Sequence, residues 1–177
     1  MARDADDEEI EEQAKHFFRL MRQTMTEGTN AVRSCVLERL PDRLPIHVVL
    51  EQQRRTMEDL WKRKIITDAQ MNILFPVNRN ADLSRIDITL WIILLRNLVP
   101  ASSVGRINWN RLPTDDDNDW FHDSIRIREK RKSLFHCNKP EIDPITFERQ
   151  WDFIARALNV NVDTDAYRNA DTETPSR

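Results

Sequence analysis

The chain has few glycines and few cysteines, and each shortage excludes classes of protein. Of its 177 residues, 2 are Gly and 2 are Cys. An all-β fold needs many tight turns, for which glycine is a usual residue, so this composition argues against one. No G-x-G or G-K-[ST] motif is present, which excludes a glycine-rich phosphate loop. Cys35 and Cys137 lack C-x-x-C spacing, so we expect neither a zinc site nor a disulfide framework.

The sequence also lacks a long apolar run. Residues 90–95 form the longest one, far shorter than the roughly 20 residues of a transmembrane helix. Residues 1–12 are acidic and do not have the basic and then apolar order of a signal peptide. Two unpaired thiols fit a reducing compartment. We therefore expect a cytoplasmic protein that does not contact a membrane.

Charge is unevenly distributed along the chain. The net charge is −3, so the molecule as a whole does not attract nucleic acid. Between residues 126 and 139, however, six cations face a single glutamate, Glu129; they are Arg126, Arg128, Lys130, Arg131, Lys132 and Lys139. A basic run of this kind either binds phosphate groups or is the solvated face of a helix. Both readings stay open at this point.

The chain reads as one domain between two polar ends. We expect a disordered acidic start over residues 1–7, a single helical domain over 8–160 and a disordered tail over 165–177. No internal repeat or low-complexity linker divides it.

Apolar spacing predicts several helices in the first half of the chain. The first covers residues 8–26, and we expect Gly28 to end it as a left-handed C-cap. Thr29 is then placed to cap a second helix, which Pro41 stops. A third helix is expected over residues 46–63.

Capping signals predict the later helices. The Thr67–Gln70 spacing is a capping box for a short fourth helix, and Ser84 resembles a second one before residues 86–99. That last segment is apolar nearly all round, so we place it at the centre of the bundle. Further helices are predicted over residues 118–135 and 144–158. The predicted fold is all-α, a multi-helix bundle with short turns.

One arginine of the 118–135 helix is unusually placed. On a helical wheel Arg131 falls within the buried stripe, at about 20° from Trp120. A cation there must reach the surface, pair with a carboxylate or lie at an interface. His136 lies about 140° from Arg131 on an unbroken helix. The two side chains can therefore converge only where the helix ends, or if a second copy supplies one of them.

Arginine and histidine together are sufficient for RNA cleavage without a metal. Histidine titrates near neutral pH and can take the proton of a ribose 2′-hydroxyl. Arginine keeps its charge and can stabilise the pentavalent phosphate. The spacing alone is common in proteins, so it does not decide between a chemical and a structural role.

The sequence resembles the HEPN domain, in the animal subfamily found in a RING-type ubiquitin ligase and in death-fold or NACHT immune-type proteins. The resemblance covers residues 29–158. Its motifs are Lys64-Ile65-Ile66-Thr67, Gln70, residues 73–76, Ile86-Asp87-Ile88-Thr89-Leu90, Leu94-Leu95-Arg96-Asn97, Trp109, Ile125-Arg126-Ile127-Arg128, Arg131, His136, Phe147 and Trp151. It implies a four-helix core, here with extra N-terminal helices, and homodimerisation.

The resemblance also assigns roles to residues. Arg131 and His136 match the signature pair that forms a metal-independent ribonuclease site at the dimer interface of active members. The polar residue after the signature arginine, usually Asn, Asp or His, is Lys132 here. Many HEPN domains have lost activity, so the alternative is a catalytically inactive dimerisation or protein-interaction module in innate-immune-type signalling.

Supporting residues complete the prediction. We expect Arg126, Arg128 and Lys132 to contact RNA phosphates. Asp87 and Arg96 are charges on the most apolar helix, so we expect them to be structural, with Asp87 able to orient Arg131. No cofactor and no metal are expected. The expected partners are a second copy, RNA and signalling proteins.

Overall fold

The computed structural model confirms the all-α prediction. It describes residues 2–77, 81–100, 108–114, 116–117 and 119–158. Within these ranges there are seven α-helices, two short 3-10 helices and no strand. No helix in the described part of the chain is long and apolar enough to cross a membrane.

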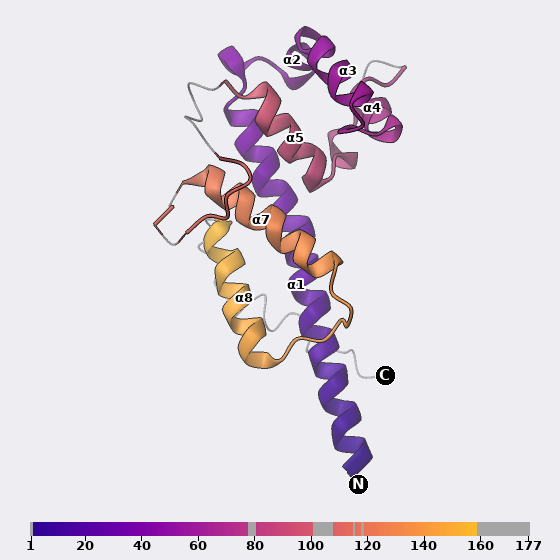
Figure 1. Ribbon diagram of the computed structural model, residues 1–177, viewed down its shortest axis with the longest axis vertical. Helices are drawn as coiled ribbons and strands as arrows, with labels where there is room; N and C mark the ends of the chain where they lie inside the picture. Colours follow the sequence, from indigo (N-terminus) through magenta and orange to yellow (C-terminus); the bar gives the residue numbers. More distant parts are fainter. Residues whose placement is uncertain (1, 78–80, 101–107, 115, 118, 159–177) are drawn as a thin grey trace, which may run out of the picture.

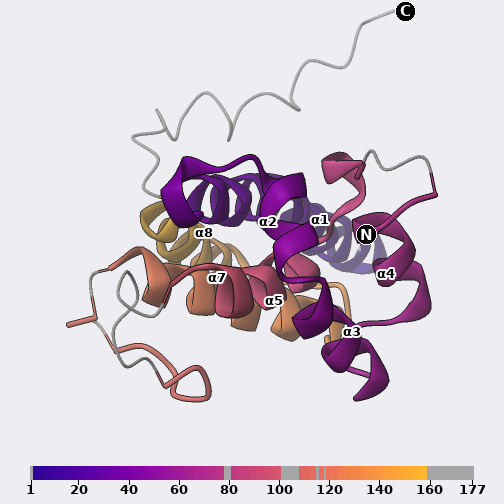
Figure 2. The same ribbon diagram turned by 90° about the horizontal axis from the view of Figure 1, so that it is seen from above.

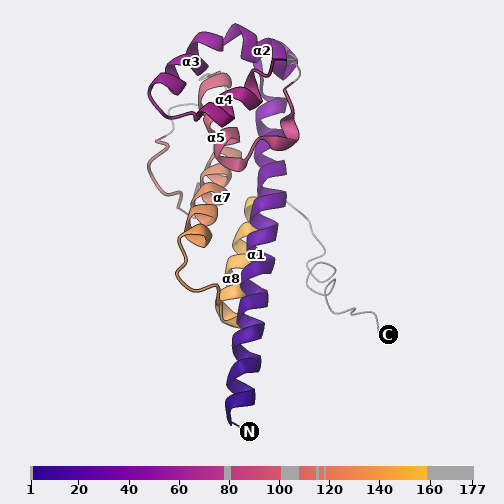
Figure 3. The same cartoon turned by 90° about the vertical axis from the view of Figure 1, so that its right-hand side faces the viewer.

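Helix α1 (Ala2–Glu38) is the longest helix, and the other helices are arranged along it (Figure 1). Helices α5, α7 and α8 pack against it and form a four-helix core. The shorter helices α2–α4 gather at its C-terminal end, and its first turns project beyond the other helices (Figure 3). The helices added to the four-helix core, α2–α4, therefore lie between α1 and α5 in the chain. The acidic start that we expected to be disordered over residues 1–7 falls in the first turns of α1, from Ala2 onward.

The predicted break at Gly28 is wrong, because α1 runs through it without interruption. Gly28 is buried where α1 crosses α7. A Cβ atom added there would lie 2.7 Å from Ile127 Cγ2 and 3.5 Å from Ile88 Cδ1. Glycine is therefore present for close packing of helices and not as a C-cap. Thr29, the expected cap of a second helix, instead donates its hydroxyl hydrogen to the Met25 carbonyl within α1.

The single helix predicted over residues 46–63 is two helices, α2 (Ile46–Gln52) and α3 (Arg54–Lys62). Gln53 separates them with φ −98° and ψ 15°. The hydrogen bonds continue across it, since its N–H donates to the Val49 carbonyl at 2.9 Å and its own carbonyl accepts from Met57 N–H at 3.1 Å. The bend lets both segments bury their apolar residues.

Capping explains the starts of α4 (Asp68–Leu74) and α5 (Ile88–Leu98). The predicted capping box of Thr67 and Gln70 is confirmed. The one at Ser84 is wrong, because Ser84 lies in a 3-10 turn capped by Asp82. The N-cap of α5 is Asp87, whose carboxylate accepts from Leu90 N–H at 2.8 Å.

Helix α8 (Pro144–Ala157) begins at the predicted Pro144, and α7 (Trp120–Phe135) begins two residues after the predicted position 118; each has an aspartate as N-cap. Helix α5 is the most buried of the set, as predicted from its apolar residues; Leu90, Trp91, Leu94 and Leu95 have no exposed surface. Figure 2 shows α5 and α7 side by side beneath α1. This arrangement brings the N-terminal end of α5 to the C-terminal part of α7.

Candidate active site at the C-terminal end of α7

Arg131 lies near the end of α7 and reaches back to the start of α5. Its Nη2 atom is 3.8 Å from Asp87 Oδ2, and its side chain is 26% exposed. The guanidinium carbon lies 4.7 Å from the centroid of the Phe135 ring. The wheel placed Arg131 on the buried side of the helix, where pairing with a carboxylate was one of the expected outcomes. The structure shows this outcome: the cation is half-buried and faces Asp87.

The contacts leave part of the guanidinium group unused. Arg131 Nε is buried and has no hydrogen-bond partner in the described part of the chain. Asp87 has two roles, because Oδ1 caps α5 while Oδ2 faces Arg131. Capping fixes the carboxylate, and the fixed carboxylate then orients the arginine. Nε is not accessible, but the part of the side chain that stays exposed lets the guanidinium group bind an anion.

His136 lies at the C-cap of α7. Its backbone N–H donates to the Lys132 carbonyl at 3.1 Å, and its imidazole is exposed. Among the described residues, no hydrogen bond or ion pair joins the side chains of His136 and Arg131. The separation of the two side chains therefore stays a prediction of the helical wheel.

Arg126 and Arg128 are bound to the connection before α7. Arg126 Nη1 lies 2.8 Å from Asp123 Oδ1, and Nη2 donates to the Thr114 carbonyl. Arg128 donates to the Trp109 carbonyl at 3.0 Å and to Glu129 at 2.9 Å.

These contacts separate the three predicted phosphate ligands. With only 11% of its side chain exposed, Arg126 acts mainly to hold the connection. Arg128 shares that task but keeps 25% of its side chain exposed. Lys132 is exposed and has no side-chain partner in the described ranges.

Arg96 does not pair with Asp87, which lies at the opposite end of α5. Its guanidinium carbon is 5.3 Å from the centroid of the Trp109 ring. Burial, and then the nearby positive charge of Arg128, lower the pKa of Arg96 from its usual value. Of the two charges predicted to be structural, Asp87 therefore contacts the candidate site directly and Arg96 contacts the connection.

A family model described as DZIP3/hRUL138-like HEPN matches residues 44–174. The match covers Asp87, Arg131 and His136 together with the helices that carry them. The chain belongs to this HEPN family. No curated protein and no solved structure matches the chain significantly.

Two features of this HEPN domain were not predicted from sequence. Trp109 contacts Arg96, Arg128 and Phe121. It was named as a motif of the resemblance, but its place in a connection without a periodic pattern gave no indication of these contacts. Lys130 appeared to be one more cation of a basic run, but it donates to Gln150 of α8. Burial, with Arg149 nearby, lowers its pKa to about 8. A search of the sequence for an arginine and a tryptophan on neighbouring segments could have suggested the contact between Arg96 and Trp109. It could not have suggested the buried environment of Lys130.

The other histidines have structural surroundings. His16 stacks on Phe147 with ring centroids 4.5 Å apart, and His122 lies 2.7 Å from the capping carboxylate of Asp119. Within the described ranges no group of three or more His, Cys, Asp or Glu side chains is placed to hold a metal ion.

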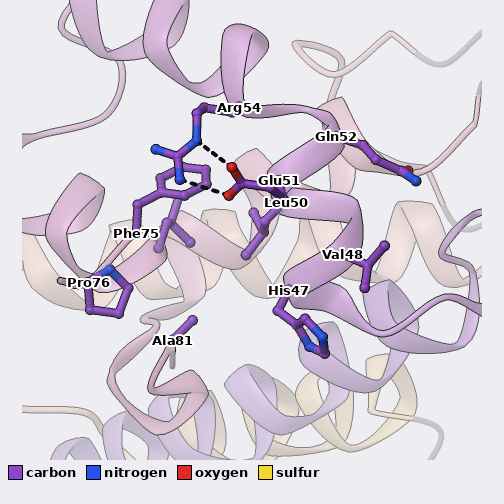
Figure 4. Close-up of a pocket in the computed structure, with 10 residues that line it drawn as sticks. His47, Val48, Leu50, Glu51, Gln52, Arg54, Phe75, Pro76 and Ala81 are labelled. Carbon is purple, nitrogen blue, oxygen red and sulfur yellow. Dashed lines mark hydrogen bonds and ion pairs between the residues drawn. The ribbon is translucent and has the colours of Figure 1, made fainter. Parts of the chain in front are cut away.

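A groove of about 630 Å³ lies between α2 and the segment after α4 (Figure 4). Arg54 donates twice to Glu51, at 3.0 and 2.7 Å, and its guanidinium carbon lies 4.1 Å from the centroid of the Phe75 ring. His47 is at its edge. Among the described lining residues, the charges of Arg54 and Glu51 are already paired with each other, so this groove is a weaker candidate site than the end of α7.

Proposed function

We propose that this HEPN domain binds single-stranded RNA at the C-terminal end of α7 and cleaves it without a metal. Arg131 stabilises the reacting phosphate, and His136 takes the proton of the 2′-hydroxyl. The observation that carries the proposal is the Arg131–Asp87 contact: a guanidinium group that keeps 26% of its side chain exposed lies 3.8 Å from a carboxylate fixed as a helix cap. Family membership supports the same site.

The step balances with these groups. The 2′-oxygen attacks phosphorus and its proton passes to the His136 imidazole, while the bond between phosphorus and the 5′-oxygen breaks and water donates a proton to the departing 5′-oxygen. The products are a 2′,3′-cyclic phosphate and a free 5′-hydroxyl. Lys132, beside Arg131 on the exposed surface, adds positive charge for binding the strand.

Two copies of the chain complete the site in this proposal. The helical wheel supports this arrangement, because it places Arg131 and His136 of one copy about 140° apart around the axis of α7. Phe135, between them in sequence, is 49% exposed and gives an apolar surface for the contact. A two-fold axis near Phe135 places the arginine of one copy near the histidine of the other.

Cleavage of a labelled single-stranded RNA in EDTA tests this proposal. We expect the wild-type chain to release a cyclic phosphate, His136→Ala to lower the rate by about 10² or more, and the exposed His47→Ala control to leave it unchanged. Mixing inactive Arg131→Gln and His136→Ala chains restores activity if the site is shared between copies. Failure of the wild type both to cleave and to bind RNA contradicts the proposal.

The second candidate is an inactive dimerisation or interaction module in innate-immune-type signalling, of the kind that accompanies RING, death-fold or NACHT modules. Lys132, in place of the usual Asn, Asp or His, favours it. So do apolar side chains exposed on α1 and α8, with Phe18 at 59% and Ile145 at 83%. A wild-type chain that dimerises in sedimentation analysis but neither binds nor cleaves RNA supports this candidate over the first.

A further inference from the structure

Arg96 carries a charge that no described carboxylate neutralises. It lies in the last turn of α5 and is exposed. Among the described residues, its only interaction partners are the Trp109 ring, 5.3 Å from its guanidinium carbon, and the positive charge of Arg128. An arginine held beside another arginine, with no acid to balance it, is an arrangement that favours an anion.

The neighbouring groups supply one carboxylate for two guanidinium groups. Glu129 lies 2.8 Å from Arg128 Nη2, which also donates to the Trp109 carbonyl. Partial burial and then the positive charge of Arg128 lower the pKa of Arg96; the second cause is a repulsion between the two cations. A bound phosphate would relieve that repulsion.

Trp109 gives this cluster a fixed geometry. Its ring meets the edge of Phe121, with centroids 5.4 Å apart and planes at 76°. Phe121 is 2% exposed, so the ring rests on the core. The indole holds the Arg96 guanidinium by a cation–π contact and reduces the entropy that the side chain loses on binding a ligand.

The cluster is continuous with the candidate active site. Arg128 and Arg131 are three residues apart on α7, so their side chains lie on the same side of the helix. Asp87 and Arg96 are at opposite ends of α5, nine residues or about 13 Å apart. One phosphate group cannot span this distance and contact both Arg131, near Asp87, and Arg96. The two arginines would therefore contact different phosphates of an RNA strand.

We propose that Arg96 and Arg128, arranged by Trp109, form a second phosphate-binding site that holds an RNA strand beyond the phosphate at Arg131. This inference rests on the proposed function, because it takes the same strand as the ligand. Arg96 is a binding residue in this scheme, away from the reacting atoms. Its loss should weaken binding of the strand while leaving the Arg131–Asp87 contact in place.

Fluorescence anisotropy with a fluorescein-labelled oligouridylate tests this site over a series of salt concentrations. Arg96→Gln should raise the Kd by about tenfold at low salt and reduce the slope of log Kd against log salt by about 0.7, as for one lost phosphate contact on a single strand. Arg55→Gln is the matched control, because Arg55 is an exposed arginine of α3 with no side-chain partner in the described ranges. Its Kd and slope should equal those of the wild type.

If Arg96→Gln lowers the melting temperature too far for a binding measurement, Arg96→Lys, which keeps the positive charge, is used in its place. Arg96→Lys should keep the wild-type salt slope but bind more weakly, because an ammonium group cannot form the paired contacts of a guanidinium. Arg96 variants that bind like the Arg55→Gln control overturn the second site. If, in that case, Arg131→Gln still weakens RNA binding, the proposed function stands without the second site. If the wild type does not bind RNA, both the proposed function and the second site are contradicted.

Discussion

The two halves of α7 carry similar cations and hold them differently. In the N-terminal part, taken here to end at Arg128, Arg126 and Arg128 donate to carbonyl groups of the connection before the helix. In the C-terminal half, Arg131 has a single carboxylate at 3.8 Å, while Lys132 and His136 have no side-chain partner in the described part of the chain. A basic run is therefore not a uniform surface. The segment that packs over it determines how much of each cation is left for a ligand: Arg126 keeps 11% of its side chain exposed and Arg128 keeps 25%.

Gly28 tests the packing on which both halves depend, and we expect the largest effect there. A methyl group at this position meets Ile127 Cγ2, in the middle of α7, at 2.7 Å. Gly28→Ala should lower the free energy of unfolding by about 1–3 kcal/mol, although alanine in an exposed helix interior stabilises by about 1 kcal/mol. Urea unfolding measures the change. In an Ile127→Ala background the penalty should shrink, and a stabilised Gly28→Ala chain would contradict this account.

Arg126 and Lys132 compare the two halves directly. Arg126→Ala removes two hydrogen bonds of a side chain that is 11% exposed and leaves Asp123 without its partner. We expect a loss of about 1–2 kcal/mol, against less than about 0.5 kcal/mol for the exposed Lys132→Ala. Chemical denaturation of both variants measures the difference. Equal losses would remove the distinction between the two halves.

Lys130 is a cation of the C-terminal half that has a buried environment, so it sharpens the comparison. Its pKa is lowered to about 8, by burial first and then by Arg149. Below this pH the lysine is charged in the folded and unfolded states and its burial costs stability. As the pH rises from about 8 toward the unfolded pKa of about 10.4, the unfolded chain binds more protons and stability increases.

Lys130→Met should remove this dependence. We expect the variant to be more stable than the wild type near pH 7 and to lose that advantage at higher pH. Unfolding curves over this pH range measure it. An advantage that does not change with pH would show that the ammonium group is not desolvated.

The smallest effect is expected at Asp117, in the connection that covers the N-terminal half. The backbone N–H of Thr114 is the main cause that lowers the pKa of Asp117 to about 2, with its hydroxyl and Arg111 contributing. A lowered carboxylate pKa stabilises the fold above about pH 4, and this contribution is lost as the pH falls toward 2. Asp117→Asn should weaken the acid dependence of the melting temperature, whereas the exposed Asp116→Asn should not.

Local signals predicted the starts of several helices. Thr67 with Gln70, and Asp143 before Pro144, act within one turn of the chain, so their meaning does not depend on distant residues. The predictions for Gly28 and Ser84 were wrong because the roles of these residues depend on other groups that pack or compete with them. Glycine fits a C-cap and a close helix crossing equally well, and only the position of Ile127 distinguishes them. Ser84 competed with Asp82 and Asp87, two carboxylates that became the actual caps.

The candidate site was partly predictable. The wheel put Arg131 on the buried stripe and separated it from His136, because both residues belong to one helix whose geometry is known in advance. The partner of Arg131 was named only as one possibility, because Asp87 is 44 positions away in the sequence. Trp109 as the partner of Arg96 could not be predicted, since it lies in a connection without periodicity.

The sequence by itself determined the all-α class, the unusual position of Arg131 and the separation of that arginine from His136. Composition, apolar period and caps act over short stretches of chain, so these properties need no knowledge of distant contacts. Tertiary structure decided which charges are used within the molecule: Asp87 meets Arg131, the connection takes Arg126, and Arg96 is left beside Arg128. The physical reason is that each of these charges is satisfied, or left unsatisfied, by groups that only the packing of α5, α7 and the connection brings within reach.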